Sequence, residues 1–306
     1  MKLSRTVRVG SRSSPLALAQ TEEILSLLRA RFVDVRFDVV RLSTRGDRNA
    51  TAVLTSLGRG AFVKDIELAL LDSEIDFAVH SAKDVGPDIP DGLRILPAGE
   101  RQDARDVLVS KTGLALMSLP AESRLGTGSP RRKAQIKAIR PDVEVLPVRG
   151  NVGTRLEKAR GADYDGVVIA AAGLARLGRL SEATEFLDVE QVTPDVGQGT
   201  LVAEFREGDE EMGAMLSSIV FEDTSCAFRA ERAFLDAIGG GCTKPVAAYG
   251  EIDGRRLRMF CMAATPDGER IVRSQSVGDV SEAEEIGRRA AKTLLESGAS
   301  EFVQGG

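Results

Sequence analysis

Two arginine-rich turns are the part of this chain whose residue types most clearly predict chemistry. Between Gly126 and Arg155 there are seven Lys or Arg against two Asp or Glu, a local net charge of +5 in a chain of formal net charge −5. The basic residues gather in Gly126-Thr-Gly-Ser-Pro-Arg-Arg132 and Val148-Arg-Gly-Asn-Val-Gly-Thr-Arg155. Glycine lets backbone N–H groups approach a ligand, and guanidinium groups bind carboxylates and phosphates through paired hydrogen bonds. The pattern predicts a site for a small polyanion.

The alternative for these arginines is a solvated surface with exposed ion pairs. Four arginines in two glycine turns, each followed by a predicted helix, favour anion binding instead, because a helix N-terminus also attracts anions. The Gly126-x-Gly128 element lacks the third glycine of a dinucleotide-binding motif, and the chain has no GxxxxGK[ST] segment. We therefore expect no nucleotide-binding loop.

Asp84 is a candidate catalytic carboxylate. It lies in His80-Ser-Ala-Lys-Asp-Val85, directly after a predicted buried strand at Ile75–His80. Ligands of open α/β sheets bind at the carboxyl ends of strands, where this carboxylate could stabilise a cation or accept a hydrogen bond from a ring N–H. The alternative is an ordinary turn or capping residue, since Asp is common at turns.

The three cysteines, Cys226, Cys242 and Cys261, are far apart and lack CxxC spacing. Neither a disulfide framework nor a metal site is therefore expected, and the single histidine, His80, weakens a metal site further. Cys226 and Cys261 are expected to be structural. Cys242 lies among glycines and near Lys244, so it is either an ordinary loop residue or a reactive thiolate.

The elements that must position these residues alternate between strand and helix. In the first hundred residues the predicted elements are Val7–Val9, a helix from Pro15 with Ser14 as its N-cap, Val35–Leu42, a helix at Phe62–Leu71, and Ile75–His80. In the second hundred they are strands Asp106–Ser110, Val143–Val148 and Asp165–Ala172, and helices Pro130–Ile139 and Thr154–Ala159. This order predicts mostly parallel sheets covered by helices on both faces.

The last third of the chain has a different pattern. Its predicted elements are a helix at Cys226–Ala237, strands at Val246–Ile252, Leu257–Ala264 and Ile271–Val277, and a last helix that a Ser281–Glu284 capping box begins. A strand at Leu201–Phe205 is expected to return to the first lobe, so the chain crosses near Gly99–Asp103 and Thr193–Thr200. The prediction is an α/β protein with two lobes joined by a double-crossover hinge, and a small C-terminal α+β domain with a three-stranded antiparallel sheet. The predicted domains are 1–99 with 200–218, 100–199, and 219–306.

Composition excludes several classes of function. The chain has 306 residues, a pI near 5.3, no Trp and 4% aromatic residues. An acidic, aromatic-poor protein suits neither duplex binding nor base stacking, so we expect no nucleic-acid partner. The N-terminus lacks the apolar stretch of a secretion signal, and no apolar run approaches the roughly 18 residues that span a bilayer. We expect a cytoplasmic protein without a membrane partner.

The motifs of the chain, taken in order, resemble one known family. They are Arg12-Ser-Ser-Pro-Leu-Ala-Leu-Ala-Gln20, Thr44-Arg-Gly-Asp47, Phe62-Val-Lys-Asp-Ile-Glu67, His80-Ser-Ala-Lys-Asp-Val85, the two arginine turns, Ala170-Ala-Ala-Gly-Leu-Ala-Arg-Leu-Gly178, Val196-Gly-Gln-Gly199 and Gly240-Gly-Cys242. Each alone is weak, but their order along nearly the whole chain is specific. The sequence resembles the porphobilinogen deaminases, also called hydroxymethylbilane synthases.

The resemblance implies a fold and a reaction. The first two lobes should resemble periplasmic binding proteins, and the third domain should carry a cofactor loop. The family is a transferase of tetrapyrrole and haem biosynthesis that deaminates and joins four porphobilinogen molecules, then releases hydroxymethylbilane by hydrolysis. Its primer is a dipyrromethane bound through a thioether to a cysteine that matches Cys242. The resemblance also implies a monomer.

The resemblance further assigns roles to residues. Asp84 matches the catalytic carboxylate, which faces pyrrole N–H groups and stabilises the cation left by deamination. Residues that match the cofactor-binding set are Lys83, Thr127, Ser129, Arg131, Arg132, Asn151 and Gln198. Residues that match the substrate-binding set are Arg12, Ser14, Gln20, Phe62, Arg149, Gly150, Arg155, Ala170 and Arg176. Two other classes of function stay open from the sequence: a non-enzymatic two-lobed anion-binding protein and a ligand-sensing regulatory domain.

Overall fold

The computed structural model describes residues 6–42, 63–239 and 244–303 of the chain. Two compact units are formed, one by Met1–Arg101 with Thr200–Ser225 and the other by Gln102–Gly199 with Cys226–Gly306. The chain therefore passes between the units three times. In the ranges described, no helix is both long and apolar enough to cross a membrane.

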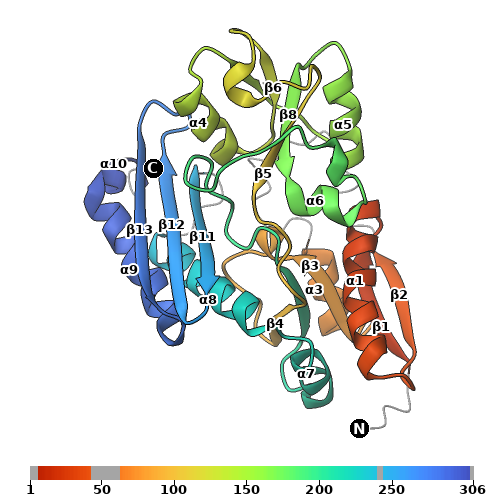
Figure 1. The fold of residues 1–306 in the computed structure, drawn as a ribbon. Coiled ribbons are helices and arrows are strands. Elements are labelled where there is room, and N and C mark those ends of the chain that lie inside the picture. The colour runs from red at the N-terminus through yellow and green to blue at the C-terminus, as the bar shows by residue number, and fades with distance from the viewer. Residues whose placement is uncertain (1–5, 43–62, 240–243, 304–306) are drawn as a thin grey trace. The chain divides into compact units, whose positions relative to one another are not determined.

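The first unit contains a five-stranded sheet in the order β2-β1-β3-β10-β4 (Figure 1). Its strands are β1 (Val7–Arg12), β2 (Phe37–Leu42), β3 (Phe77–Ser81), β4 (Leu93–Ala98) and β10 (Leu201–Arg206). β1 is parallel to β2 and β3, whereas β10 is antiparallel to both β3 and β4. The predicted strand at Leu201–Phe205 therefore does return to the first sheet.

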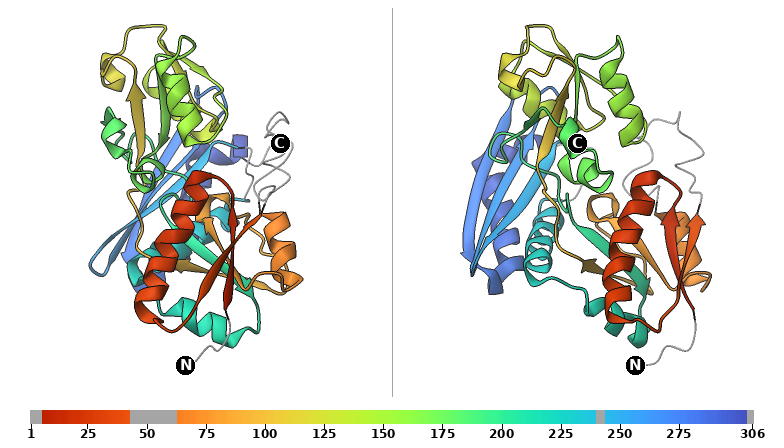
Figure 2. Two further views of the ribbon diagram at one scale, coloured as in Figure 1. Left: turned by 90° about the vertical axis from the view of Figure 1, so that its right-hand side faces the viewer. Right: turned by 45° about the vertical axis from the view of Figure 1, so that its right-hand side comes forward.

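Helices cover both faces of this sheet. α1 (Pro15–Arg31) and α7 (Glu210–Ser217) pack on one face and α3 (Lys64–Leu71) on the other, and Figure 2 shows α1 and α3 on opposite sides of the strands. The start of α1 is the predicted one, because Pro15 is at its first position and Ser14 Oγ accepts the Ala17 N–H at 3.2 Å. Pro is favoured there since it has no N–H to leave unpaired.

The second unit begins with another five-stranded sheet, in the order β7-β6-β8-β5-β9. Its strands are β5 (Asp106–Ser110), β6 (Arg124–Gly126), β7 (Glu144–Leu146), β8 (Gly166–Ala170) and β9 (Glu185–Phe186). β6 is parallel to β7 and β8, and β5 is antiparallel to β8. α4 (Pro130–Ile139) packs on one face, and α5 (Val152–Arg160) and α6 (Ala171–Arg176) pack on the other.

One predicted strand is too long. The prediction was Asp165–Ala172, but β8 ends at Ala170 and α6 begins at Ala171. A short apolar run buried on both sides has neither the period of a strand nor that of a helix, so the sequence pattern does not mark this boundary.

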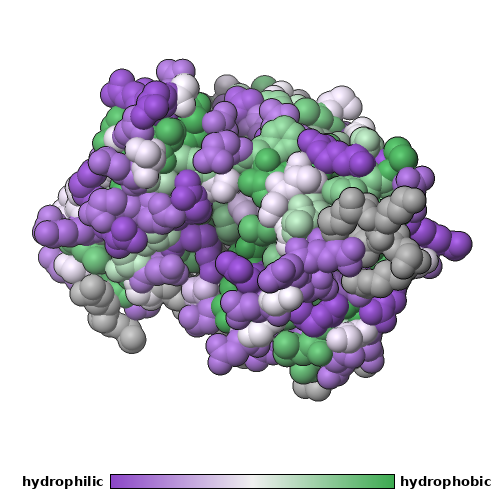
Figure 3. All heavy atoms as spheres, turned by 90° about the horizontal axis from the view of Figure 1, so that it is seen from below, coloured by the Kyte–Doolittle hydropathy of each residue, from purple (hydrophilic) through white to green (hydrophobic). Residues whose placement is uncertain are grey.

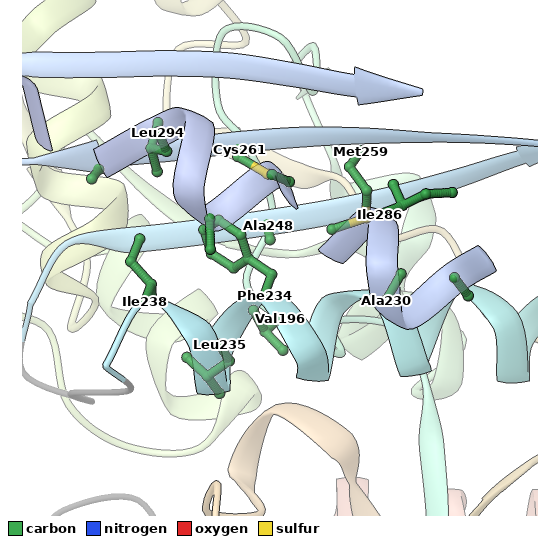
Figure 4. Packing of buried hydrophobic residues seen from close by; sticks show 14 of the residues in the cluster. Val196, Ala230, Phe234, Leu235, Ile238, Ala248, Met259, Cys261, Ile286 and Leu294 are labelled. Atoms are coloured by element: carbon green, nitrogen blue, oxygen red, sulfur yellow. The ribbon is translucent and has the colours of Figure 1, made fainter. Parts of the chain in front are cut away.

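A three-stranded antiparallel sheet completes the second unit. Its strands are β11 (Val246–Asp253), β12 (Arg256–Ala264) and β13 (Ile271–Asp279). α8 (Glu222–Ala237) and α9 (Ala283–Leu294) pack on one face, as Figures 1 and 4 show, and a short α10 (Ser300–Val303) follows. Ala134 of α4 packs on the other face. The predicted fold class, an α/β protein with two sheet-containing lobes and a small C-terminal three-stranded antiparallel sheet, is confirmed. The two larger sheets are mixed, whereas mostly parallel sheets were predicted, because β10 and β5 each pair antiparallel with both of their neighbours.

The α8–α9 contact depends on a glycine. A Cβ placed on Gly287 would lie 2.1 Å from the carbonyl oxygen of Ala230. Only glycine lets the two helices cross at this distance, so the position of α8 under the sheet depends on Gly287.

The predicted capping box of the last helix is wrong. Asp279, at the end of β13, accepts hydrogen bonds from Ser281 N at 3.1 Å and Ser281 Oγ at 2.7 Å. A 3₁₀ turn at Val280–Glu282 follows, and α9 begins at Ala283 without a side-chain cap. The ionised Asp279 is a stronger acceptor than a hydroxyl, so it takes the role that the sequence pattern assigned to Ser281.

The outer surface is of mixed polarity. On the face shown in Figure 3, hydrophilic residues surround scattered apolar ones. Some large apolar side chains are well exposed, including Val33 at 82% and Met117 at 65%. Single exposed apolar residues are normal on protein surfaces, so the candidate site must come from the strand ends and not from an apolar patch.

Candidate functional site

Most of the predicted site residues in the second unit follow the carboxyl ends of three parallel strands. β6, β7 and β8 end at Gly126, Leu146 and Ala170; β6 and β7 lead through turns into α4 and α5, and β8 leads directly into α6. Because these strands are parallel, the residues after them meet at one edge of the sheet. The predicted residues at this edge are Thr127, Ser129, Arg131, Arg132, Arg149, Gly150, Asn151, Arg155, Ala170 and Arg176.

Arg131 and Arg132 form a buried ion cluster with Asp106, a residue that the sequence analysis did not select. The Arg131 Nη1–Asp106 Oδ2 and Arg132 Nη2–Asp106 Oδ1 distances are both 2.8 Å. The exposed fraction of the three side chains is at most 6%. The register of β5 places Asp106 opposite Ala170, which puts the cluster at the same edge.

The electrostatics of the cluster favour a charged Asp106. Burial by itself would raise the pKa of this carboxyl, but the two guanidinium groups and their hydrogen bonds lower it well below its ordinary value. Two guanidinium groups against one carboxylate leave a net positive charge. In addition, within the described ranges the buried Arg131 Nε has no hydrogen-bond partner. The cluster therefore keeps both a charge and a donor that suit an anionic ligand.

Gln198, which is predicted to bind the cofactor, joins this cluster. Its Nε2 donates to Asp106 Oδ1 at 2.8 Å and to the Ala104 carbonyl at 2.6 Å. Its Oε1 accepts from Arg132 Nη2 at 3.2 Å. The amide thus fixes the orientation of the Arg132 guanidinium relative to Asp106.

Ser129 and Asn151, both predicted ligands, are also helix caps. Ser129 Oγ accepts from Arg132 N at 3.4 Å at the start of α4, and Asn151 Oδ1 accepts from Thr154 N at 2.9 Å at the start of α5. A capping hydroxyl still has its O–H, and a capping amide still has its N–H groups. Both caps can therefore donate to an anion while they hold the helix N-termini in place.

Glycines shape the turns that lead into these helices. Gly150 has φ +113°, and a Cβ there would lie 2.7 Å from Thr154. Its carbonyl accepts from Arg155 Nε at 2.8 Å, so the turn itself orients a predicted substrate-binding side chain. The two arginine turns are in close contact at Gly128, because a Cβ on Gly128 would lie only 3.0 Å from the Val148 carbonyl oxygen.

The predicted residues of the first unit lie at the carboxyl edge of its own sheet. β1 ends at Arg12, and the parallel neighbour β3 ends at Ser81 and is followed by a 3₁₀ turn at Ala82–Asp84. Asp84 is exposed and Lys83 is half-buried, so the Asp84 carboxylate is both a turn residue and open to a ligand. Ser14, the cap of α1, follows β1 at the same edge, and Gln20 is buried in the second turn of α1. Phe62 and Cys242 lie outside the described residues.

The two other cysteines have the structural roles predicted for them. Cys226 is 2% exposed and its Sγ donates to the Val280 carbonyl at 3.3 Å. Cys261 lies in the core of β12, where burial raises the pKa of its thiol far above the ordinary value. Neither thiol is suited to nucleophilic chemistry.

Comparison with known proteins identifies the family. Residues 7–214 match the family described as porphobilinogen deaminase, dipyromethane cofactor binding domain, and residues 226–296 match porphobilinogen deaminase, C-terminal domain. The chain belongs to the porphobilinogen deaminase family. Porphobilinogen deaminase of Thermus thermophilus is 44% identical over 301 residues, which are 98% of each chain. The Bacillus subtilis porphobilinogen deaminase is 41% identical over 304 residues, 98% of this chain and 96% of that one.

Some solved structures have a limited likeness to this chain. The Escherichia coli periplasmic aliphatic sulphonate binding protein SsuA has a TM-score of 0.43 and 12% identity, covering 76% of this chain and 70% of that one. The effector binding domain of a BenM variant has a TM-score of 0.41 and 14% identity, covering 71% of this chain and 93% of that one.

The second unit fits the cofactor that the family name implies. The groups at its sheet edge are donors: guanidinium, amide and hydroxyl groups, and helix N–H groups. The buried Arg131 Nε has no hydrogen-bond partner among the residues that the structure describes, and Gly128 is exposed. A donor set of this kind suits a small molecule whose side chains are carboxylates.

Proposed function

We propose that this chain deaminates and joins four porphobilinogen molecules on a covalently bound dipyrromethane, and then releases hydroxymethylbilane by hydrolysis. The observation that carries this proposal is the family match, which covers both domains and nearly the whole chain. The donor-rich sheet edge of the second unit supports it, because each porphobilinogen brings an acetate and a propionate. A growing polyanion accounts for the +5 segment in an acidic chain.

The residues of the second unit bind and orient in this proposal. Thr127, Ser129, Arg131, Arg132, Asn151 and Gln198, with Lys83 of the first unit, hold the dipyrromethane. The substrate is bound by Arg12, Ser14, Gln20, Phe62, Arg149, Gly150, Arg155, Ala170 and Arg176, and the arginines among them bind its carboxylates. The dipyrromethane, when bound, supplies the pyrrole carbon at which chain growth begins. Guanidinium groups bind each carboxylate in ground state and transition state alike, so they contribute mainly to substrate affinity.

Asp84 has the catalytic role in this proposal. Its carboxylate accepts a hydrogen bond from the pyrrole N–H of the substrate and stabilises the positive charge that develops on that ring as ammonia leaves. Its exposure suits this role, because a carboxylate already paired inside the protein would have little charge to offer. In this proposal Lys83, beside it in the sequence, binds the dipyrromethane.

Cys242 is the proposed attachment point, through a thioether. Intact mass spectrometry of the protein from a host that makes porphobilinogen should give the chain mass plus two pyrrole units. Cys242→Ser should lack this addition, and Cys261→Ser, a substitution of a buried structural thiol, should keep it. An active wild-type protein of unmodified mass, or an addition retained in Cys242→Ser, would overturn the assignment.

The cellular context completes the proposal. We expect a cytoplasmic monomer that binds a small-molecule substrate and no nucleic acid or membrane. The substrate and the monomeric state rest on the family resemblance, and the other expectations rest on the composition of the sequence. Size-exclusion chromatography with light scattering should give the mass of one chain, 32.7 kDa. A dimer mass at working concentration would contradict the monomer.

A further inference from the structure

Glu231 is a buried carboxylate that the proposed chemistry does not use. It lies in α8, is 0% exposed, and accepts two backbone N–H groups, one on each oxygen. Gly250 N of β11 donates to Oε1 at 2.7 Å, and Gly197 N donates to Oε2 at 2.7 Å. Glu231 therefore joins the three-stranded sheet to the segment Val196–Gly199. This segment contains Gln198, which is a proposed cofactor-binding residue.

This segment is anchored at both of its ends. Val196 is 3% exposed and packs in the hydrophobic core below the three-stranded sheet, beside Phe234 and Leu235 (Figure 4). At the other end, the carbonyl of Gly199 accepts from Arg176 Nη2 at 3.0 Å. Through this hydrogen bond the backbone of the segment orients the guanidinium of Arg176, which is a proposed substrate-binding residue.

The middle of the segment orients a second arginine. Gln198 is 0% exposed and binds both Asp106 and Arg132 through its amide. Directly before it, Gly197 has φ +72°, a left-handed conformation that fixes where the next side chain begins. The hydrogen bond from Gly197 N to Glu231 thus holds the turn from which Gln198 reaches the arginine cluster.

We propose that Glu231 is a positioning residue for anion binding: through the Gly197 N–H it sets the segment Val196–Gly199, and through that segment it orients the guanidinium groups of Arg132 and Arg176. This inference rests on the proposed function and adds a residue remote from substrate to it. A carboxylate is suited to the task because it accepts on both oxygens, and hydrogen bonds to an ionised acceptor are the stronger ones. Glutamine has the same shape but only one acceptor, so one of the two N–H groups would face an NH₂ donor.

The first experiment is Glu231→Gln, measured by steady-state consumption of porphobilinogen. Loss of the ionised acceptor that Gly197 N and Gly250 N share should raise KM about tenfold with kcat nearly unchanged, because Arg176 binds the substrate in the ground state and the transition state alike. The matched control is Ile286→Val, a fully buried residue of the same core that does not touch the segment. A purely structural defect reduces the fraction of active protein, so this control should lower the apparent kcat and leave KM unchanged.

A double-mutant cycle tests the route. If Glu231 acts through Gln198, then Gln198→Ala combined with Glu231→Gln should raise KM little more than the larger single effect. Glu231→Gln with Ile286→Val should instead multiply the two effects on kcat/KM. Multiplicative effects with Gln198→Ala, or a KM for Glu231→Gln equal to that of the wild type, would overturn the proposal.

Hydrogen exchange provides a readout without turnover. Amides of Val196–Gly199 should exchange about tenfold faster in Glu231→Gln than in Ile286→Val, because the hydrogen bond of Gly197 is lost. Equal exchange would overturn the inference even if the wild type proved inactive, whereas an inactive wild type with the expected exchange would count against the proposed function alone. Should Glu231→Gln fail to fold, Glu231→Asp keeps the charge, cannot reach both N–H groups, and is measured in the same way.

Discussion

Asp106→Asn is the substitution that most directly tests the buried arginine cluster. Asparagine preserves the size of the side chain but removes its charge, and its NH₂ group must face a guanidinium donor. Arg131 and Arg132 would then be two buried cations without a counter-charge, since both now approach Asp106 at 2.8 Å. The protein should be strongly destabilised although no cavity is formed.

The magnitude follows from the geometry. At about 3 Å and an effective dielectric constant of about 20, each contact contributes about 5–6 kcal/mol of gross attraction. Desolvation of the fully buried carboxylate offsets several kcal/mol of this, so removal of the charge should lower the free energy of unfolding by about 3–5 kcal/mol. In a unit of this size such a loss corresponds to a decrease in Tm of roughly 10 °C.

Urea-induced unfolding followed by circular dichroism measures this loss. The control is Glu251→Gln, which removes the carboxylate of an exposed cross-strand pair whose Arg258–Glu251 distance is 3.9 Å. This control should change the free energy of unfolding by no more than about 0.5 kcal/mol. A loss below about 1 kcal/mol for Asp106→Asn would refute the reasoning, because the arginines would then not depend on the carboxylate.

The pH dependence of the free energy of unfolding, compared between the wild type and Asp106→Asn, provides an independent check. The pKa of Asp106 is lower in the folded protein than in the unfolded chain, so its stabilisation is fully present above the unfolded value and is lost as pH falls toward the folded one. The difference between wild type and Asp106→Asn should therefore be constant from pH 7 to about 5 and shrink below about pH 4, near the ordinary Asp pKa of about 3.9. A constant difference down to pH 3 would contradict the assignment.

Three further substitutions test other parts of the site and fold. Asp84→Asn should slow product formation by about 10²–10⁴-fold in a steady-state assay. Its free energy of unfolding should stay within about 0.5 kcal/mol of that of the wild type, since the residue is exposed. Normal turnover would contradict the catalytic role of Asp84. Gly150→Ala should destabilise the protein by about 1–3 kcal/mol in urea and raise KM, because φ is +113° and the new Cβ meets Thr154; an unchanged KM would separate this turn from the site. Gly287→Ala should lower Tm by several degrees in a thermal melt, since its Cβ would lie 2.1 Å from the Ala230 carbonyl; a wild-type Tm would mean that the helices separate without cost.

Local signals in the sequence predicted the elements that begin with strong punctuation. α4 was predicted as Pro130–Ile139 and has these bounds, because Ser129 caps it and Pro130 occupies its first position. The boundary at Ala170 was missed because the apolar run around it has no period. The cap of α9 was missed because the sequence cannot show that Asp279 reaches Ser281 before the helix begins.

The sequence predicted a set of candidate site residues but not the contacts among them. Arginines in glycine turns indicated an anion site, and the strand before Asp84 indicated a position at a strand end. Their partner, Asp106, is distant in sequence and comes beside them only through the antiparallel pairing of β5 with β8. The role of Glu231 could not be predicted from the sequence either, since an acidic residue on an amphipathic helix is normally solvated.

Because two of the three thiols are buried, the reactive thiol of Cys242 can be titrated selectively. Cys226 and Cys261 are each 2% exposed, so an alkylating reagent added to the folded protein reaches neither quickly. Any thiol that reacts in native buffer then belongs to Cys242, and formation of a thioether there removes it. A colorimetric titration of native against denatured protein would report the fraction of chains that carry a primer, in a cuvette and within minutes.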